Sequence, residues 1–558
     1  MRFKPIEDLF NAISGIKSIP ELMQTVGELH KVGVDALFSS FSMTDQKCSS
    51  VYAFYLAQGG LSLPDKDYYL KDSFAQIRQD FKSHVTKMFK LQGATHEQAE
   101  MWAGVVLDIE TELAKASRSR VELRDPEKNY NKVNATDLAQ KYSSLSLGEY
   151  INRSGVPKLN YAIVMQPEFL DSLGVQLKSH SIDEWKIYLK WHTLSTFAHY
   201  LHKEVSDEDF DFFGNKLTGK LKPEERWKDS IKLVDGKIGE ALGKLYVDRH
   251  FTPDAKNKAN GLVKDLLEVV EERLKNVPWM SEETKKKALD KLSKFTVKIG
   301  YPDKFRDYSG LSIDPSDLVG NIRRANEFEW NRTIKRVGQP VDRAEWFMTA
   351  PTVNAYYSPT ENEIVFPAGI LQPPFFDPKM DSAVNYGAIG AVIGHEITHG
   401  FDDQGRQYDG DGNLHDWWTK QDLTEFKLRT DPIVKEYGAQ EVLPGKSING
   451  ELTLGENIAD LGGVSIAYEA LQRKLARDQS ERRIVDGLTP EQRFFIAYAQ
   501  VWKESIREVE SVKRLVTDPH SPGKIRAKLP AENHPDFDLA FPPKDGSITP
   551  RKDKVGVW

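Results

Sequence analysis

The sequence predicts a mainly α-helical protein with a small β component, divided into two domains. A chain of 558 residues is too long for a single hydrophobic core. Most of the first 300 residues show apolar side chains at helical spacing, joined by short turns. From about residue 350 the pattern changes, and two short strand-like segments appear, separated by polar turn residues. These observations favour a helical N-terminal domain and a mixed C-terminal domain.

Two helix starts stand out in the N-terminal half. Thr252 is a good N-cap, Pro253 suits the first helical position, and Asp254 complements the helix dipole. Apolar residues then follow at four-residue spacing: Leu262, Leu266, Val270 and Leu274. Ser281, followed by two glutamates, predicts a second start. Ordinary amphipathic core helices account for both patterns.

Turn-forming residues at 301–303 and 308–310 interrupt the helical pattern. We therefore expect one domain over residues 1–310 and a second over 311–558. In the second domain, residues 353–357 and 363–367 predict short strands. The apolar, glycine-containing stretch at 381–402 predicts a buried helix.

This helix contains the string His395-Glu396-Ile397-Thr398-His399. His395 and His399 lie one turn apart on one helix face, so both imidazoles can reach one metal ion. Glu396 lies at the edge of that face, where it can take a proton from a zinc-bound water. Such a string arises by chance in roughly a few per cent of chains of this length, so alone it only suggests a metal site.

A second segment, at 455–460, supplies the groups that such a site lacks. Glu456 offers a third ligand and leaves one position open, as catalytic zinc requires. Asp460, one turn later, and Asp402, three residues after His399, can each accept a ring N–H from a ligating histidine. Either aspartate could equally be a helix-face or capping carboxylate. In combination with the histidines they favour one Zn²⁺ per chain.

Composition excludes several other functions. The net charge of -7, from 76 basic and 83 acidic residues, gives no reason to expect nucleic acid or an anionic membrane as partner. No apolar run is long enough for a membrane segment, and Glu7 and Asp8 lie where a signal peptide would be apolar. Cys48 is the only cysteine, so no intrachain disulfide can form. The chain as written predicts a cytoplasmic protein, while a periplasmic or secreted location stays open if residues precede Met1. The oligomeric state is not encoded in any pattern that we recognise.

Longer blocks of sequence resemble the neprilysin family of zinc metallopeptidases, which includes endothelin-converting enzymes and bacterial oligopeptidases of the PepO type. The blocks are NAYYSP at 354–359, EIVFPAGILQPPFF at 363–376, VIGHEITHGFDDQG at 392–405, GENIADLGG at 455–463, YAQVW at 498–502 and TDPHSPGKIR at 517–526. Fainter similarity extends over nearly the whole chain, which ends in Val557-Trp558 as family members do.

The resemblance implies zinc bound by His395, His399 and Glu456, with Glu396 as general base and Asp460 as a supporting acid. It also implies roles that spacing cannot reveal. Asn354 and Ala355 match positions that bind the substrate main chain, His520 matches the group that steadies the oxyanion, and Arg526 matches the arginine that holds a substrate carbonyl. Further positions match the wall of the pocket for the residue after the scissile bond: Ile370, Phe375, Val392, Val501 and Trp502.

The family fold implied is that of a two-domain gluzincin, in which a thermolysin-like catalytic domain and a helical cap domain enclose a cavity. The implied activity is hydrolysis of oligopeptides on the amino side of hydrophobic residues, by Glu-assisted attack of a zinc-bound water. Family members carry a further segment before the position that matches Met1. That difference keeps open an alternative, a catalytically inactive member that binds peptides. A zinc aminopeptidase ranks last, because no Gly-x-Met-Glu-Asn string is present.

Overall fold

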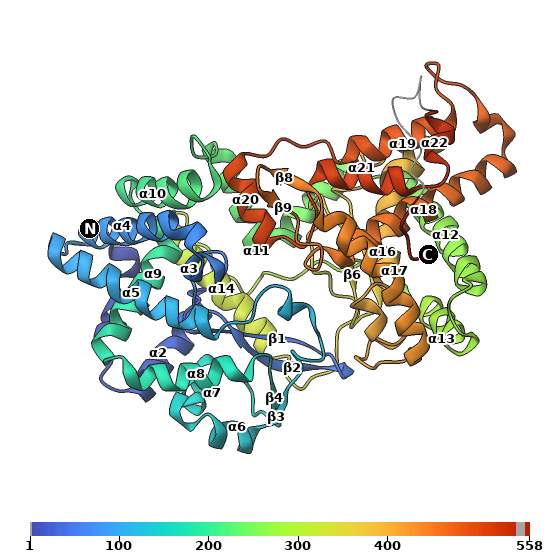
Figure 1. Ribbon diagram of the computed structural model, residues 1–558. Coiled ribbons are helices and arrows are strands. Elements are labelled where there is room, and N and C mark those ends of the chain that lie inside the picture. Colours follow the sequence, from blue (N-terminus) through green and yellow to red (C-terminus); the bar gives the residue numbers. More distant parts are fainter. Residues whose placement is uncertain (1–2, 543–552) are drawn as a thin grey trace.

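The computed structural model describes residues 3–542 and 553–558, which form two mainly helical lobes with a few short strands (Figure 1). The blue and blue-green helices of residues 6–217 fill one lobe in Figure 1, while most of the orange and red C-terminal helices, with the green helices of residues 253–293, fill the other. The predicted class, mainly α with a small β component, is confirmed.

The N-terminal lobe is built on a four-stranded sheet in the order β1-β2-β4-β3. β1 (Phe38–Asp45) and β2 (Cys48–Gln58) form an antiparallel hairpin, while β4 (Tyr161–Val164) runs parallel to β2 and antiparallel to β3 (Lys132–Asn134). One face of the sheet shares a hydrophobic core with the surrounding helices. These are α1 (Glu7–Ser14), α2 (Ile19–Lys31), α3 (Asp67–Leu70), α4 (Ala75–Gln92), α5 (His96–Ala116), α6 (Ala135–Lys141), α7 (Leu147–Ser154), α8 (Pro167–Ser179), α9 (Ile182–Ala198) and α10 (Lys203–Asp209).

The C-terminal lobe contains a three-stranded sheet in the order β5-β7-β6, formed by β5 (Thr296–Gly300), β6 (Tyr356–Ser358) and β7 (Glu363–Pro367). The predicted strand at 363–367 is confirmed, but the other begins only at Tyr356, so Asn354 and Ala355 precede it. A small hairpin of β8 (Glu441–Leu443) and β9 (Lys446–Ser447) lies apart from this sheet. The helices are α12 (Pro253–Asn276), α13 (Glu282–Ser293), α15 (Ser382–Asn385), α16 (Ala391–His399), α17 (Lys420–Gly438), α18 (Leu454–Arg477), α19 (Pro490–Val501), α21 (Gly523–Asn533) and α22 (Phe537–Ala540). Helix α20 (Glu508–Thr517) contacts both cores, through Val512 and Val516 on the N-terminal side and Leu515 on the C-terminal side.

The two helix starts expected from sequence are confirmed. Thr252 accepts a hydrogen bond from the backbone N–H of Ala255 at the start of α12, and Ser281 does the same from Thr284 at the start of α13. Each cap satisfies a backbone donor that the first helical turn leaves without a partner.

The two hydrophobic cores interleave along the chain. Residues 6–217 supply most of the N-terminal core, but α14 (Leu318–Ile334) also packs there, whereas α12 belongs to the C-terminal core. Helix α11 (Arg226–His250), which has a kink at Ile238, passes from one core to the other. The chain therefore crosses between the lobes more than once, and a single boundary at residue 310 stays a prediction.

The tip of the β1–β2 hairpin reaches into the C-terminal lobe, as Figure 1 shows. The Thr44 hydroxyl donates to Glu361 at 2.6 Å, and the backbone N–H of Ser49 donates to the side chain of Asn413 at 2.9 Å. These contacts join the two lobes through residues that belong to neither α11 nor α14.

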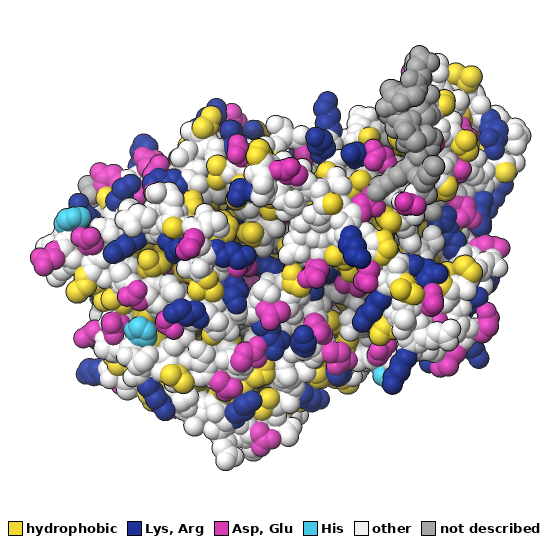
Figure 2. All heavy atoms as spheres, viewed as in Figure 1, with side chains coloured by type: hydrophobic (Ala, Val, Ile, Leu, Met, Phe, Trp, Pro, Cys, Tyr) yellow, Lys and Arg dark blue, Asp and Glu magenta, His cyan; other side chains and the backbone are white. Residues whose placement is uncertain are grey.

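On the face drawn in Figure 2, Lys and Arg side chains alternate with Asp and Glu, as the modest net charge predicts. Within residues 3–542 and 553–558, no helix combines the length and the apolar character that crossing a membrane would need.

Candidate active site

The predicted metal-binding string lies at the C-terminal end of a long buried helix in the C-terminal lobe. α15, a π-helical turn (Tyr386–Gly390) and α16 run continuously into it, and the helix ends at His399 rather than at residue 402. Asp402 therefore lies in the loop that follows the helix. That loop is held in shape because the carboxylate of Asp402 accepts the backbone N–H groups of Gln404 and Gly405 at 2.8 and 2.7 Å.

Glycines allow α18 to pack closely against α16. A Cβ added at Gly394 would lie 2.8 Å from the carbonyl oxygen of Gly463, and one added at Gly463 would lie 2.5 Å from that of Ala391. Such distances leave no room for a side chain at either position. Because the two backbones touch here, Glu456 and Asp460 of α18 come to lie directly beside His395 of α16.

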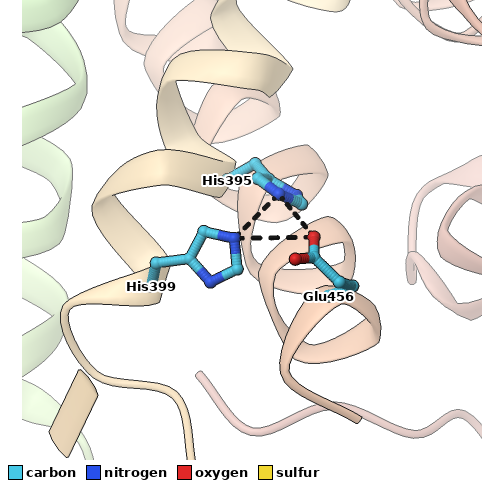
Figure 3. Close-up of side chains that lie close together, drawn as sticks. All are labelled: His395, His399 and Glu456. Atoms are coloured by element: carbon cyan, nitrogen blue, oxygen red, sulfur yellow. Dashed lines mark hydrogen bonds and ion pairs between the residues drawn. The ribbon is translucent and has the colours of Figure 1, made fainter. Parts of the chain in front are cut away.

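The three predicted metal ligands converge on one point (Figure 3). Nε2 of His395 lies 3.0 Å from Nε2 of His399 and 3.1 Å from Oε2 of Glu456, and the third separation is 3.6 Å. A tetrahedral zinc ion with bonds of about 2.0–2.1 Å would hold its ligand atoms roughly 3.3 Å apart. Oε2 of Glu456 is buried and accepts no well-formed hydrogen bond from the described residues. This cluster therefore fits a zinc ion with one position left open.

Each histidine is oriented through its other ring nitrogen. Nδ1 of His395 lies 2.8 Å from Asp460, and Nδ1 of His399 lies 2.7 Å from Asp402. A carboxylate that accepts from Nδ1 leaves the Nε2 lone pair free for a metal and fixes the ring plane. The structure thus brings each of the two sequence-predicted aspartates to one of the two histidines, Asp460 to His395 and Asp402 to His399.

Asp460 also binds Arg526, which spacing alone did not predict. Nε and Nη2 of Arg526 each donate to the carboxylate at 2.8 Å, and the guanidinium lies 3.8 Å above the ring of Trp502. Burial would raise the pKa of Asp460, but the charge of Arg526 and the hydrogen bond from His395 outweigh it and hold that pKa at about 2. Asp460 therefore stays ionised beside the metal site.

Glu396 and His520 face the same site from two sides. Glu396 is 6% exposed, and burial raises the pKa of its carboxyl group. His520 extends from the loop before α21, with Nδ1 2.8 Å from Asp518 and Nε2 3.2 Å from Glu456. Burial would lower the pKa of His520, but these two carboxylates raise it to about 9.

A cavity of about 510 Å³ opens over the cluster. Its walls include most of the residues that the resemblance assigned to substrate: Asn354, Ala355, Ile370, Phe375, Val392, Trp502, His520 and Arg526. Val501, at the end of α19, is half-buried and is not among the lining residues. Asp460 lies behind the ligands rather than on the cavity wall, in keeping with its contact to His395.

Sequence reasoning missed other residues at the site. Arg124 and Pro126 of the N-terminal lobe line the cavity, although the sequence places them some 270 residues from His395 and gives no local signal. Asn457, next to Glu456, accepts a hydrogen bond from Ser521 at 2.7 Å and so fixes the loop that presents His520. Asn457 could have been identified from the sequence by its position within the GENIAD block.

Known proteins are similar to this chain in sequence and in fold. Models of "Peptidase family M13" match residues 1–302 and 354–555. This chain belongs to peptidase family M13. Endothelin-converting enzyme 1 of Mus musculus is 34% identical over 584 residues, which cover 100% of this chain and 75% of that protein. Neprilysin-3 of Drosophila melanogaster is 32% identical, covering 100% and 74%. The predicted neprilysin-family zinc metalloendopeptidase is thereby confirmed.

Solved structures of the family agree. The zinc metalloprotease Zmp1 of Mycobacterium tuberculosis in complex with an inhibitor is 40% identical and superposes with a TM-score of 0.93, covering 97% of this chain and 83% of that one. An open state of Zmp1 covers 100% and 88%, also at 40% identity, but with a TM-score of 0.73. By TM-score, the chain described here is therefore more similar to the inhibitor complex than to the open state. The two-domain family fold is confirmed, and the inactive alternative finds no support in these relatives.

Proposed function

We propose that this M13 endopeptidase cleaves oligopeptides on the amino side of hydrophobic residues, with one zinc ion per chain held by His395, His399 and Glu456. The observation that supports this proposal most directly is the shared cavity. A three-ligand cluster with an open position, a buried glutamate and an apolar wall all face the same 510 Å³ space. When bound, zinc would polarise the scissile carbonyl and acidify a water molecule.

Glu396 is the proposed general base. It would take a proton from the attacking water as the oxygen bonds to the carbonyl carbon, and deliver a proton to the amide nitrogen as the C–N bond breaks. Its raised pKa suits both halves of this exchange, since a carboxylate with a pKa nearer neutrality is a better base and then a useful acid. Asp460 and Asp402 would keep the two histidines oriented throughout.

Substrate contacts are assigned from the cavity wall. Asn354 and Ala355 lie just before β6 and would bind the peptide main chain in extended form. Two nitrogens of Arg526 bind Asp460, which leaves Nη1 for a substrate carbonyl. His520, protonated beside Asp518 and Glu456, would donate a hydrogen bond to the developing oxyanion.

The specificity pocket would be formed by Ile370, Phe375, Val392 and Trp502, with Val501 behind them. The four named first are apolar or aromatic and line the cavity. Because charged side chains lose hydration in such a pocket without gaining a partner, hydrophobic residues should be preferred after the scissile bond.

The proposal is tested with purified protein and a panel of internally quenched peptides that differ only in the residue after the scissile bond. Leu and Phe should be cleaved faster than Asp or Lys, and a zinc chelator should abolish cleavage. Glu396→Gln should lower kcat on the order of 10²–10⁴-fold while zinc content, measured by atomic absorption, stays at one per chain. Cleavage that resists the chelator, or equal activity in Glu396→Gln, would overturn the mechanism. Preference for Asp or Lys would overturn the pocket assignment.

A further inference from the structure

Arg124 belongs to the N-terminal lobe, but its side chain lies in the C-terminal lobe. It ends a short 3₁₀ turn (Glu122–Arg124) a few residues after α5, whose apolar side chains pack in the N-terminal core. The Arg124 side chain is only 15% exposed, and it forms part of the wall of the active-site cavity.

The guanidinium joins two loops of the C-terminal lobe. Nη2 donates to both carboxylate oxygens of Asp403, at 3.0 and 2.8 Å, and Nη1 donates to the backbone carbonyl of Glu451. With the amide oxygen of Gln404 turned toward the guanidinium, it accepts from Nε at 3.2 Å, while the amide nitrogen donates to the Arg124 carbonyl at 3.2 Å. A planar, multiply bonded guanidinium fixes its partners more rigidly than a lysine could.

Both loops lead directly to the metal ligands. Asp403 follows Asp402, the residue that orients His399, and Glu451 lies five residues before Glu456. The guanidinium also packs on the first turn of α18. A Cβ added at Gly455 would lie 3.0 Å from Nη2 of Arg124, so the residue before Glu456 touches the arginine itself.

The charge of Arg124 matters as well as its contacts. Asp402 and Asp403 are adjacent carboxylates in a partly buried loop. Burial and then the charge of Asp402 raise the pKa of Asp403 to about 6, and Arg124 acts in the opposite direction. Without the guanidinium, repulsion between the two carboxylates would favour movement of Asp402 away from His399.

We propose that Arg124 is a positioning residue that couples closure of the two lobes to the geometry of the zinc ligands. Only when the N-terminal lobe meets the C-terminal lobe does one side chain tie the loop after His399 to the loop before Glu456. When the lobes part, the tie is lost and the ligand helices are less well aligned. This inference rests on the proposed function for its effect on catalysis, but not for its effects on zinc binding and lobe arrangement.

The test compares Arg124→Ala, Arg124→Lys and Asp403→Asn with Arg120→Ala as a matched control. Arg120 lies four residues earlier, is 43% exposed, and pairs with Asp65 within its own lobe. Each protein is measured for zinc affinity by competition with a chromophoric chelator, for radius of gyration by small-angle X-ray scattering, and for kcat and KM on a quenched peptide.

We expect Arg124→Ala to bind zinc about 10-fold or more weakly, as removal of groups that orient ligands does elsewhere. Its radius of gyration should rise and kcat should fall by up to about 10²-fold. Arg124→Lys should fall between Arg124→Ala and the wild type, and Arg120→Ala should match the wild type. Combining Arg124→Ala with Asp403→Asn should add little, because each removes the same tie.

Wild-type zinc affinity and scattering in Arg124→Ala would overturn the proposal. If Arg124→Ala does not fold, Asp403→Asn tests the same tie from the C-terminal lobe. The hydrogen bond from the backbone N–H of the hairpin residue Ser49 to the C-terminal lobe remains in that variant. A wild-type protein that cleaves no peptide would refute the proposed function. The zinc and scattering measurements would still decide whether Arg124 acts as proposed.

Discussion

Asp460 accepts from Nδ1 of His395 at 2.8 Å while both of its oxygens also bind the guanidinium of Arg526. One ionised carboxylate thus orients a metal ligand on α16 and a cavity-lining arginine on α21. Because the carboxylate is nearly inaccessible to water, no solvent molecule can readily replace either contact.

Replacing this carboxylate should weaken the metal site without unfolding the lobe. We expect Asp460→Asn to lower zinc affinity by about 10–100-fold, since the neutral amide is a weaker acceptor for His395 and no longer balances the charge of Arg526. Chelator competition at fixed pH measures the change. Glu469→Gln serves as control, because Glu469 lies on the same helix but pairs with Arg273 away from the ligands. Equal zinc affinity in Asp460→Asn and wild type would contradict this account of the site.

Truncating an apolar side chain in the cavity wall should change the preference between substrates more than the rate of the chemical step. For Phe375→Ala, we expect the ratio of kcat/KM for a Leu-containing peptide over its Ala counterpart to fall on the order of tenfold, because the pocket loses contacts made to the larger side chain. Paired quenched peptides give the ratio directly. Leu428→Ala removes an exposed leucine on α17 and should leave it unchanged. An unaltered ratio in Phe375→Ala would remove that residue from the pocket.

Close packing of α16 on α18 predicts a steric effect. Gly463→Ala would place a methyl group 2.5 Å from the carbonyl oxygen of Ala391, and we expect it to cost about 1–3 kcal/mol of unfolding free energy and to weaken zinc binding. Gly261→Ala on α12 is the matched control, since an added Cβ there meets nothing within 4 Å. That variant should be neutral or more stable by up to about 1 kcal/mol. Denaturant titrations of both variants make the comparison, and equal losses would argue against the helix contact.

Acid should destabilise the C-terminal lobe through His534. Burial, and then the charges of Arg273 and Lys554, lower the pKa of this ring to about 3 in the folded protein, against about 6.5 in an unfolded chain. Between those values only the unfolded chain binds the proton. The contribution of His534 to the unfolding free energy should therefore fall by up to about 1.4 kcal/mol for each pH unit below 6.5.

His534→Gln should show a shallower loss of stability between pH 6 and pH 4 than the wild type. Denaturant midpoints measured with a chelator present throughout exclude loss of zinc as the cause. Parallel pH profiles for the two proteins would show that the ring has the same pKa in the folded and unfolded states, and would contradict this account.

Local sequence was sufficient for the parts of the fold and site that depend on neighbouring residues. The capped starts of α12 and α13 followed from short-range signals, because a cap bonds a backbone group three residues away. The end of the zinc helix did not, because the loop that follows it is also held by Lys291, more than a hundred residues earlier, which donates hydrogen bonds to the carbonyl groups of Gly400 and Gly405.

By itself, the sequence determined that two histidines of one helix and a glutamate of another could hold one metal ion, because helical spacing alone places the histidines on one face. Only the tertiary structure decided which groups complete the site. Contact between Gly394 and Gly463 sets the distance between the ligand helices, Arg526 shares Asp460 with His395, and Arg124 enters from the other lobe. None of these pairings is encoded by spacing, because each depends on how segments far apart in the chain pack together.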